Sequence, residues 1–344
     1  MPRALGGIVL SLGLFVSVIL GAHEESKGRN NGPAPYPGGG AKAVLWNDPT
    51  DIETRYLVFG SGGEDHQPHG PFTFVAEDME GTNPKMDVRD QDGVKWKVKL
   101  GPEARPEVAA SRFVWAAGYF TQEDYFLQDL TVQGLPGHLH RGQDLVGADG
   151  TLHNVRLKRS EKGESKLGTW QWSSNPIGGT REFNGLRVLM ALMNNWDLKD
   201  DNNSVYLEKR KDGFPEQIYL VSDLGASFGT TGFTLSVENS RGNLEAYKRS
   251  KFITNRSKDK VDFATPSRPT LVETFNVPVF VHRLDLRWIG RDIPRADAKW
   301  MGQLLSRLSS EQIRNAFRAA GYSKQDVEDF ATVVQGRIAE LSAL

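Results

Sequence analysis

Residues 195–202 read Asn-Trp-Asp-Leu-Lys-Asp-Asp-Asn, and residues 221–225, a short way downstream, read Val-Ser-Asp-Leu-Gly. A helix with an apolar stripe is predicted over 181–193, immediately before the first segment. A hairpin is predicted over 205–221, between the two segments. Both polar segments are therefore expected at the ends of regular elements, where carboxylate and amide side chains are available for chemistry.

Alternating side chains upstream predict a small antiparallel sheet. Residues 94–100, VKWKVKL, place Val, Trp, Val and Leu on one face of a strand. Three lysines share the opposite face: Lys95, Lys97 and Lys99. A short apolar run at 72–75 and a short strand candidate at 86–89 precede this strand and complete a meander. A helix is then predicted over 107–117, since proline marks its start and glycine follows its end.

The rest of the body is expected to be mixed. Residues 119–132 are predicted to be extended, residues 163–179 loop-like, and residues 226–270 irregular. Helices are predicted over 310–320 and from 323 to about 341, where serine and glycine provide start and stop signals. The fold class expected from these patterns is α+β.

These parts, in this order, resemble the protein-kinase-like fold. A lysine-bearing third strand, a helix with an early glutamate, an Asp-x-Lys-x-x-Asn loop and an Asp-Leu-Gly segment carry the resemblance, which covers about residues 72–225. Because no His-Arg precedes the aspartate, the loop is more similar to HipA-like and other atypical kinases. The resemblance implies two lobes: an N-lobe of antiparallel sheet plus helix over 66–133, and a mainly helical C-lobe over 134–344.

The resemblance assigns roles to the two polar segments. Phosphoryl transfer depends mainly on positioning and on neutralising charge. Asp197 is expected to orient or deprotonate the acceptor hydroxyl, and Lys199 is expected to reach the transferring phosphoryl group. Asn202 and Asp223 offer the oxygen ligands that suit Mg²⁺.

The resemblance also assigns the nucleotide-binding residues. Lys99 is expected to hold the α- and β-phosphates of ATP and to pair with Glu107. Lys97 shares the same strand face, and Glu103 lies close to Glu107 in the sequence, so both alternatives remain open. The turn that contains Gly81 is expected to cover the phosphates with its backbone N–H groups.

Three features depart from the family pattern. The chain has no Gly-x-Gly-x-x-Gly loop, Asn195 and Trp196 stand where His-Arg is usual, and no Ala-Pro-Glu follows Asp223. The acceptor is therefore undefined. The function expected is transfer of the ATP γ-phosphoryl group to a hydroxyl of a protein or small molecule. Nucleotidyl transfer on the same scaffold, a nucleotide-binding pseudokinase and a structural protein whose Asp-rich loop binds Ca²⁺ are the alternatives.

The N-terminus predicts export. Arg3 is followed by an uncharged apolar run over 4–22, which is typical of a signal peptide or an uncleaved N-terminal anchor. Residues 23–65 are interpreted as a linker and leader segment, rich in Gly, Pro and Asn at their start. Both readings of residues 1–22 place the body outside the cytoplasm. Contact with a membrane is expected through such an anchor alone.

Composition narrows the chemistry further. The 344 residues carry a formal net charge of −1, so no bulk attraction to nucleic acid is expected. The chain contains no cysteine, which excludes disulfides, thiolate catalysis and Cys-ligated metals. An exported body without disulfides must depend on a large core. Lysine, aspartate and asparagine are left to carry the reaction.

Overall fold

The computed structural model describes residues 41–344 except for 82, 161–164, 210–212, 231–239 and 265–284. The signal peptide or anchor predicted over 1–22 lies outside the described residues, as does the linker as far as residue 40. Among the described residues, no helix combines the length and the apolar character needed to cross a membrane.

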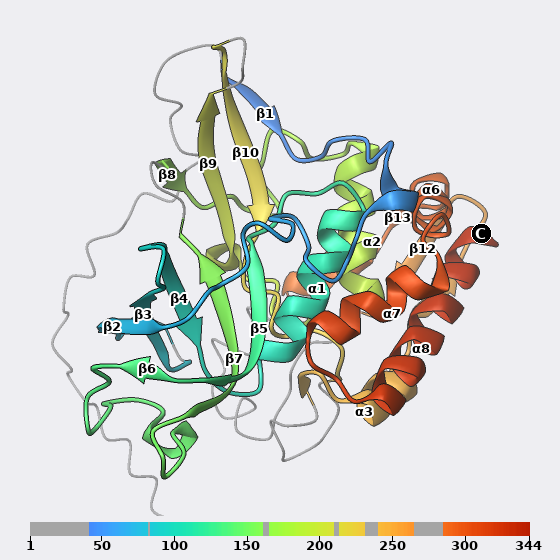
Figure 1. The fold of residues 1–344 in the computed structure, drawn as a ribbon. Coiled ribbons are helices and arrows are strands. Elements are labelled where there is room, and N and C mark those ends of the chain that lie inside the picture. Colours follow the sequence, from blue (N-terminus) through green and yellow to red (C-terminus); the bar gives the residue numbers. More distant parts are fainter. Residues whose placement is uncertain (1–40, 82, 161–164, 210–212, 231–239, 265–284) are drawn as a thin grey trace, which may run out of the picture. The chain divides into compact units, whose positions relative to one another are not determined.

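A six-stranded sheet contains the predicted meander (Figure 1). Its strands, in spatial order, are β5 (Asp124–Leu130), β7 (Leu152–Arg159), β4 (Lys95–Lys99), β3 (Lys85–Arg89), β2 (Phe72–Asp78) and β6 (Val132–Gln133). Neighbours pair antiparallel except β2 and β6. The meander is confirmed, but β7 was not predicted, although it lies between β4 and β5. This sheet therefore takes strands from both sides of residue 133.

A second sheet contains the predicted hairpin, which is also confirmed. Its strands, in spatial order, are β1 (Lys42–Val44), β10 (Pro215–Val221), β9 (Asn203–Lys209) and β8 (Ser165–Gly168). The loop expected over 163–179 was wrong where β8 forms, because this strand gains its hydrogen bonds from β9. A third, smaller sheet consists of β11 (Ile253–Arg256), β12 (Lys260–Phe263) and β13 (Ile293–Pro294).

The described helices are α1 (Ala104–Ala116), α2 (Arg181–Leu192), α3 (Leu244–Arg249), α6 (Arg295–Leu305), α7 (Ser310–Ala319) and α8 (Lys324–Ser342). Local caps explain several starts: the side chains of Thr180, Ser309 and Ser323 accept backbone N–H groups in the first turns of α2, α7 and α8. The irregular structure expected over 226–270 was wrong in part, since α3, β11 and β12 form there. The described fold is mixed α+β.

The described residues form two apolar clusters, and helix α1 contributes to one of them. One cluster lies on one face of the six-stranded sheet and includes Val88, Trp96 and Val98, all fully buried. The other joins α1 to α2, α6, α7 and α8 through residues such as Phe113 and Phe317. The helix packs against β5, β7 and α7. Because the sheet buries its apolar face, its lysine-bearing face is left for polar contacts.

Candidate active site

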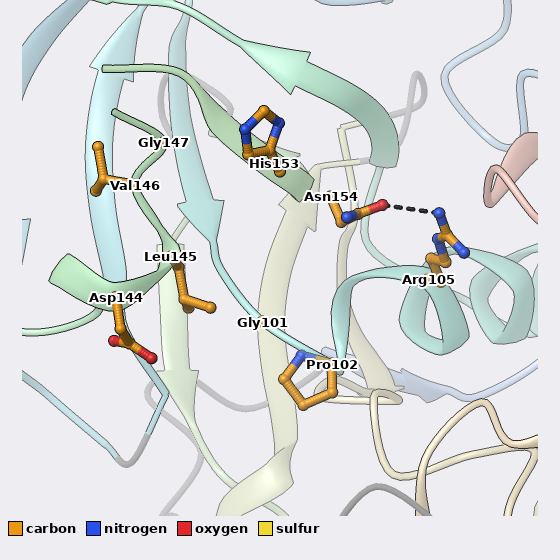
Figure 2. A pocket seen from close by; sticks show the side chains of 9 residues that line it. All are labelled: Gly101, Pro102, Arg105, Asp144, Leu145, Val146, Gly147, His153 and Asn154. Atoms are coloured by element: carbon orange, nitrogen blue, oxygen red, sulfur yellow. Dashed lines mark hydrogen bonds between the residues drawn. The ribbon is translucent and has the colours of Figure 1, made fainter. Parts of the chain in front are cut away.

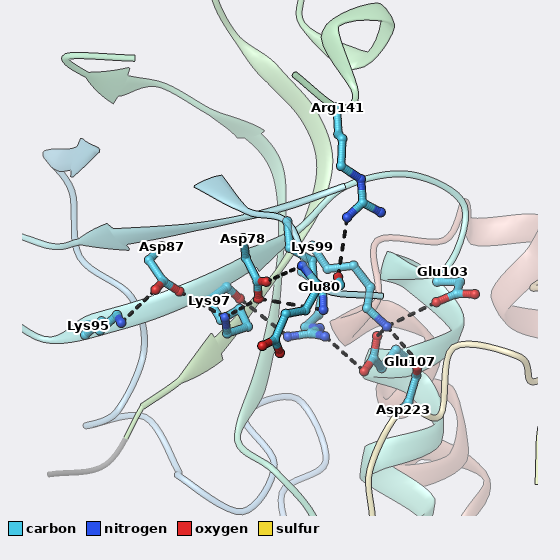
Figure 3. Close-up of polar contacts among 12 residues, drawn as sticks. Asp78, Glu80, Asp87, Lys95, Lys97, Lys99, Glu103, Glu107, Arg141 and Asp223 are labelled. Atoms are coloured by element: carbon cyan, nitrogen blue, oxygen red, sulfur yellow. Dashed lines mark hydrogen bonds and ion pairs between the residues drawn. The ribbon is translucent and has the colours of Figure 1, made fainter. Parts of the chain in front are cut away.

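Lys99 is the centre of a buried group of charges (Figure 3). It is the last residue of β4, and its side chain is 5% exposed. Its Nζ lies 2.8 Å from Glu107 Oε2, 2.8 Å from Asp223 Oδ1 and 3.1 Å from Glu103 Oε2. The structure thus brings together three residues that the sequence placed in separate elements, together with the alternative glutamate.

Local geometry explains how these side chains meet. Helix α1 starts soon after β4 ends, and Glu103 and Glu107 are four residues apart, so they lie on one face of its first turns. Asp223 follows the end of β10 and adopts a left-handed backbone conformation, with φ of 55°. Such a conformation is uncommon for a residue with a side chain and often marks a functional position.

The charges stabilise one another in their ionised forms. Burial lowers the pKa of Lys99, but the carboxylates of Glu107 and Asp223 outweigh it and raise this pKa above its ordinary value. Burial raises the pKa of Asp223, but the ammonium of Lys99 holds it below the ordinary value. Lys99 is therefore a cation and Asp223 an anion at neutral pH.

Arg156 forms a second ion pair with Glu107, through the carboxylate oxygen that Lys99 does not contact. This residue of β7 pairs with Lys99 in the sheet register, and its side chain is buried. Its Nη2 lies 3.1 Å from Glu107 Oε1, and its Nε lies 3.6 Å from Asp124 Oδ1. Arg156 was not predicted as a site residue, because the strand that carries it was not recognised in the sequence. Arg156 restricts Glu107 to the side of α1 that faces Lys99.

The loop at 195–202 folds back against the end of β10. The Nδ2 of Asn202 donates to the carbonyl of Asp197 at 2.7 Å, and Ser222 N donates to the carbonyl of Asn202 at 2.8 Å. Lys199 Nζ lies 3.2 Å from Asp197 Oδ1. Asp197, Lys199 and Asn202 are thereby held together, and Asn202 is bonded to the residue that precedes Asp223.

Lys97 and Lys99 have different surroundings. Lys97 Nζ pairs with Asp78 and lies 3.3 Å from Asp87 Oδ1, and its side chain is 28% exposed. The ion pair with Glu107 belongs to Lys99 instead. Figure 3 shows the two lysines side by side, with Lys97 facing the β2–β3 carboxylates. Of the two lysines that the sequence left open, Lys99 is therefore the one that pairs with Glu107.

The turn after β2 reaches this charged group. Gly81 has a left-handed φ of 68°, and Asn83 Nδ2 donates to Glu103 Oε2 at 2.6 Å. Arg141 donates to the carbonyl of Glu80 at 3.4 Å (Figure 3). The turn is therefore attached to the first turn of α1, beside Lys99.

The carboxylates differ in their fitness to hold a metal ion. Among the described residues, Glu103, Glu107 and Asp223 place carboxylate oxygens within 4.8 Å of one another. The side chains of Glu103 and Glu107 are only 5% and 2% exposed, whereas that of Asp223 is 40% exposed. Asp223 is therefore the carboxylate open to an incoming cation. Asn202 donates through its amide nitrogen, and an amide also has an oxygen that can serve as a ligand.

A cavity of about 530 Å³ lies at the start of α1 (Figure 2). Its lining residues are Gly101, Pro102, Arg105, Asp144, Leu145, Val146, Gly147, His153 and Asn154. Arg105 Nη2 donates to Asn154 Oδ1 at 2.8 Å, at one side of the cavity (Figure 2). None of the predicted site residues lines this cavity, so it is separate from the group around Lys99.

Lys158, on the lysine-bearing face of the six-stranded sheet, is expected to make the stability of the protein depend on pH. It lies opposite Lys97 in the register of β7 and β4, and burial together with the charge of Arg156 lowers its pKa to about 8. Between about pH 8 and about pH 10.5 the unfolded chain binds more protons than the folded chain, so the free energy of unfolding should rise with pH. Lys158→Met should remove this rise and increase stability at neutral pH. Urea denaturation across this range measures both effects.

Lys166 supplies the matched control, because it is exposed on β8. Lys166→Met should leave the dependence of stability on pH unchanged. If the free energies of unfolding of wild type and Lys158→Met change in parallel with pH across the whole range, the lowered pKa of Lys158 in the folded protein is contradicted.

The chain was compared with family models, curated proteins and solved structures, and similarity is found to a solved structure. No family model matches the chain, and no curated protein matches it. Among solved structures, the chain is similar to the crystal structure of a Helicobacter pylori proinflammatory kinase, CtkA, with 11% sequence identity and a TM-score of 0.41. The similarity covers 79% of this chain and 96% of that chain.

Proposed function

We propose that this protein is an ATP-dependent phosphotransferase with a protein-kinase-like fold, which moves the γ-phosphoryl group of ATP to a hydroxyl. The observation that carries the proposal is the meeting of Lys99 with Glu107 and Asp223, each at 2.8 Å. A strand lysine, a helix glutamate and the aspartate of an Asp-Leu-Gly segment are the parts that organise phosphates and metal in protein kinases. The export signal expected over residues 1–22 extends the proposal to a location outside the cytoplasm.

In this proposal, phosphate binding, metal binding and proton acceptance fall to different residues. Lys99, held by Glu107, binds phosphate oxygens, and Arg156 keeps Glu107 in place. Asp223 and Asn202 supply oxygen ligands for Mg²⁺, which neutralises phosphate charge when it is bound. Asp197 accepts the proton of the acceptor hydroxyl. The hydroxyl oxygen then bonds to the γ-phosphorus, while the bond from that phosphorus to the bridging oxygen breaks and ADP leaves.

Nucleotide binding is the first test. Mg²⁺-ATP at about one hundred times its Kd should stabilise the purified protein by about 2.7 kcal/mol, which raises the Tm by several degrees. Asp223→Ala should lose most of this shift, because it removes the carboxylate open to the metal. The measurement is a thermal unfolding curve with Mg²⁺-ATP, with ATP plus EDTA, and with Ca²⁺ alone.

Labelled ATP then separates the alternatives. Label transferred from the γ position supports phosphotransfer, whereas label retained from the α position supports nucleotidyl transfer. Binding without either transfer supports a pseudokinase. A protein whose Tm responds to no nucleotide contradicts all three, and stabilisation by Ca²⁺ alone favours a structural role for the Asp-rich loop.

A further inference from the structure

Glu103 lies at the junction of four parts of the chain. Its carboxylate contacts Lys99 Nζ at 3.1 Å, accepts a hydrogen bond from Asn83 Nδ2 at 2.6 Å and lies 2.9 Å from Arg241 Nε. Its side chain is 5% exposed, so these contacts are made out of water. A buried carboxylate that accepts two hydrogen bonds and forms an ion pair with a third group fixes the relative positions of the segments that carry these groups.

The segment after Asp223 also packs against Glu103. A Cβ added to Gly225 would lie 2.6 Å from Glu103 Cβ, closer than real Cβ atoms approach other atoms. The backbone at Gly225 therefore rests directly on the glutamate, which requires a residue without a side chain. Asp223, two residues earlier, is positioned by the same contact.

Arg241 extends the junction to the loop that carries Asp197. Its guanidinium lies 5.3 Å from the ring centroid of Trp196, a distance typical of a cation–π contact. Trp196 Nε1 donates to the carbonyl of Ser240 at 2.8 Å, so the indole and the arginine segment are bonded as well as stacked. Trp196 directly precedes Asp197.

We propose that Glu103 is a positioning residue that couples the turn at Asn83 to the segment at Arg241. The coupling runs through the Glu103 carboxylate, which contacts both Asn83 and Arg241 and also pairs with Lys99. While Arg241 and Asn83 engage Glu103, its negative charge is offset, and Lys99 remains with Glu107 and Asp223. If the charge of Arg241 is removed, Glu103 attracts Lys99 more strongly, and its hydrogen bond from Asn83 is expected to weaken. Its significance for phosphotransfer rests on the proposed function, but the mechanical coupling does not.

The coupling is tested first without nucleotide, by hydrogen exchange in Glu103→Gln and Arg241→Gln. Arg241→Gln should speed exchange at least about threefold in peptides that contain Asn83, which Arg241 does not itself contact in any described hydrogen bond or ion pair. Glu103→Gln should speed exchange in peptides that contain Asn83 and in those that contain Gly225. Arg241→Lys, which keeps the charge, should restore most of the protection.

The matched control is Arg307→Gln, which removes an exposed ion pair with Glu53 at 3.0 Å. It should leave both peptides unchanged. If Arg241→Gln alters exchange around residue 241 alone, the coupling is overturned. If Glu103→Gln fails to fold, the Arg241 variants still decide the question, because they leave the buried glutamate in place.

The second measurement is Mg²⁺-ATP affinity. In a wild type that binds Mg²⁺-ATP, Arg241→Gln should weaken binding at least about fivefold, and Arg241→Lys should recover it. Unchanged affinity together with faster exchange at Asn83 would overturn the link to the nucleotide site. A wild type that binds no nucleotide contradicts the proposed function instead, while the exchange data still decide the coupling.

Discussion

Asp197→Ala is expected to slow phosphoryl transfer by about 10²–10⁴-fold, the range typical of a lost general base. Affinity for Mg²⁺-ATP should change by less than about twofold, because the residue acts on the acceptor hydroxyl rather than on the nucleotide. Asp197 lies in the loop that Asn202 and Ser222 hold at the end of β10, beside Lys199. Single-turnover transfer from γ-labelled ATP and a separate nucleotide titration measure the two quantities.

Asp201→Ala is the matched control in the same loop, since Asp201 is exposed. It should retain transfer close to the wild-type rate. Asp223→Ala should behave in the opposite way to Asp197→Ala, with metal-dependent binding lost before transfer can be measured. Equal losses of transfer in the Asp197 and Asp201 variants would contradict the role given to Asp197.

Lys99→Met is expected to have the largest effect on stability. Lys99 is the cation that contacts Glu103, Glu107 and Asp223 directly. Removing one partner of a buried ion pair costs about 3–5 kcal/mol, because the opposite charge is left unpaired away from water. Binding of Mg²⁺-ATP should be lost as well. Urea unfolding and nucleotide titration are the measurements.

The stability cost of Lys99→Met should depend on pH. Lys99 holds the pKa of Asp223 below its ordinary value, so the variant raises this pKa in the folded state. The folded variant then binds more protons than wild type in acid, and its deficit in stability should shrink as the pH falls below neutral. A deficit that stays constant from neutral pH into the acid range would contradict an electrostatic origin.

Lys97→Met is the comparison that separates the two lysines. Lys97 is more exposed than Lys99 and pairs with Asp78 and Asp87 on the neighbouring strands. Its loss should cost less stability than that of Lys99 and should leave Mg²⁺-ATP binding within about threefold of wild type. If the Lys97 variant loses nucleotide binding and the Lys99 variant keeps it, the assignment between them is reversed.

Local patterns were sufficient to predict several elements. The meander, the hairpin and the helices capped by Thr180, Ser309 and Ser323 follow from alternation, turns and caps, which involve residues close in sequence. β7 and β8 were missed. Asn154 interrupts β7 with a left-handed φ of 52°, and β8 is a short strand with a register shift against β9. Pairing with neighbouring strands, rather than local pattern, establishes both.

The sequence alone was enough to predict candidate site residues around 197–202 and at 223, because that prediction depends on residue type and order. It could not choose between Lys97 and Lys99, which alternation places on the same strand face. The choice depends on where α1 docks, and the Lys99–Asp223 contact joins residues 124 positions apart. Glu103, Arg156 and Arg241 likewise acquire their roles only through packing. The alternation of apolar and polar side chains is a property of residues close in sequence, so it can be recognised without the fold. Contacts between distant residues form only when the chain between them closes into a loop.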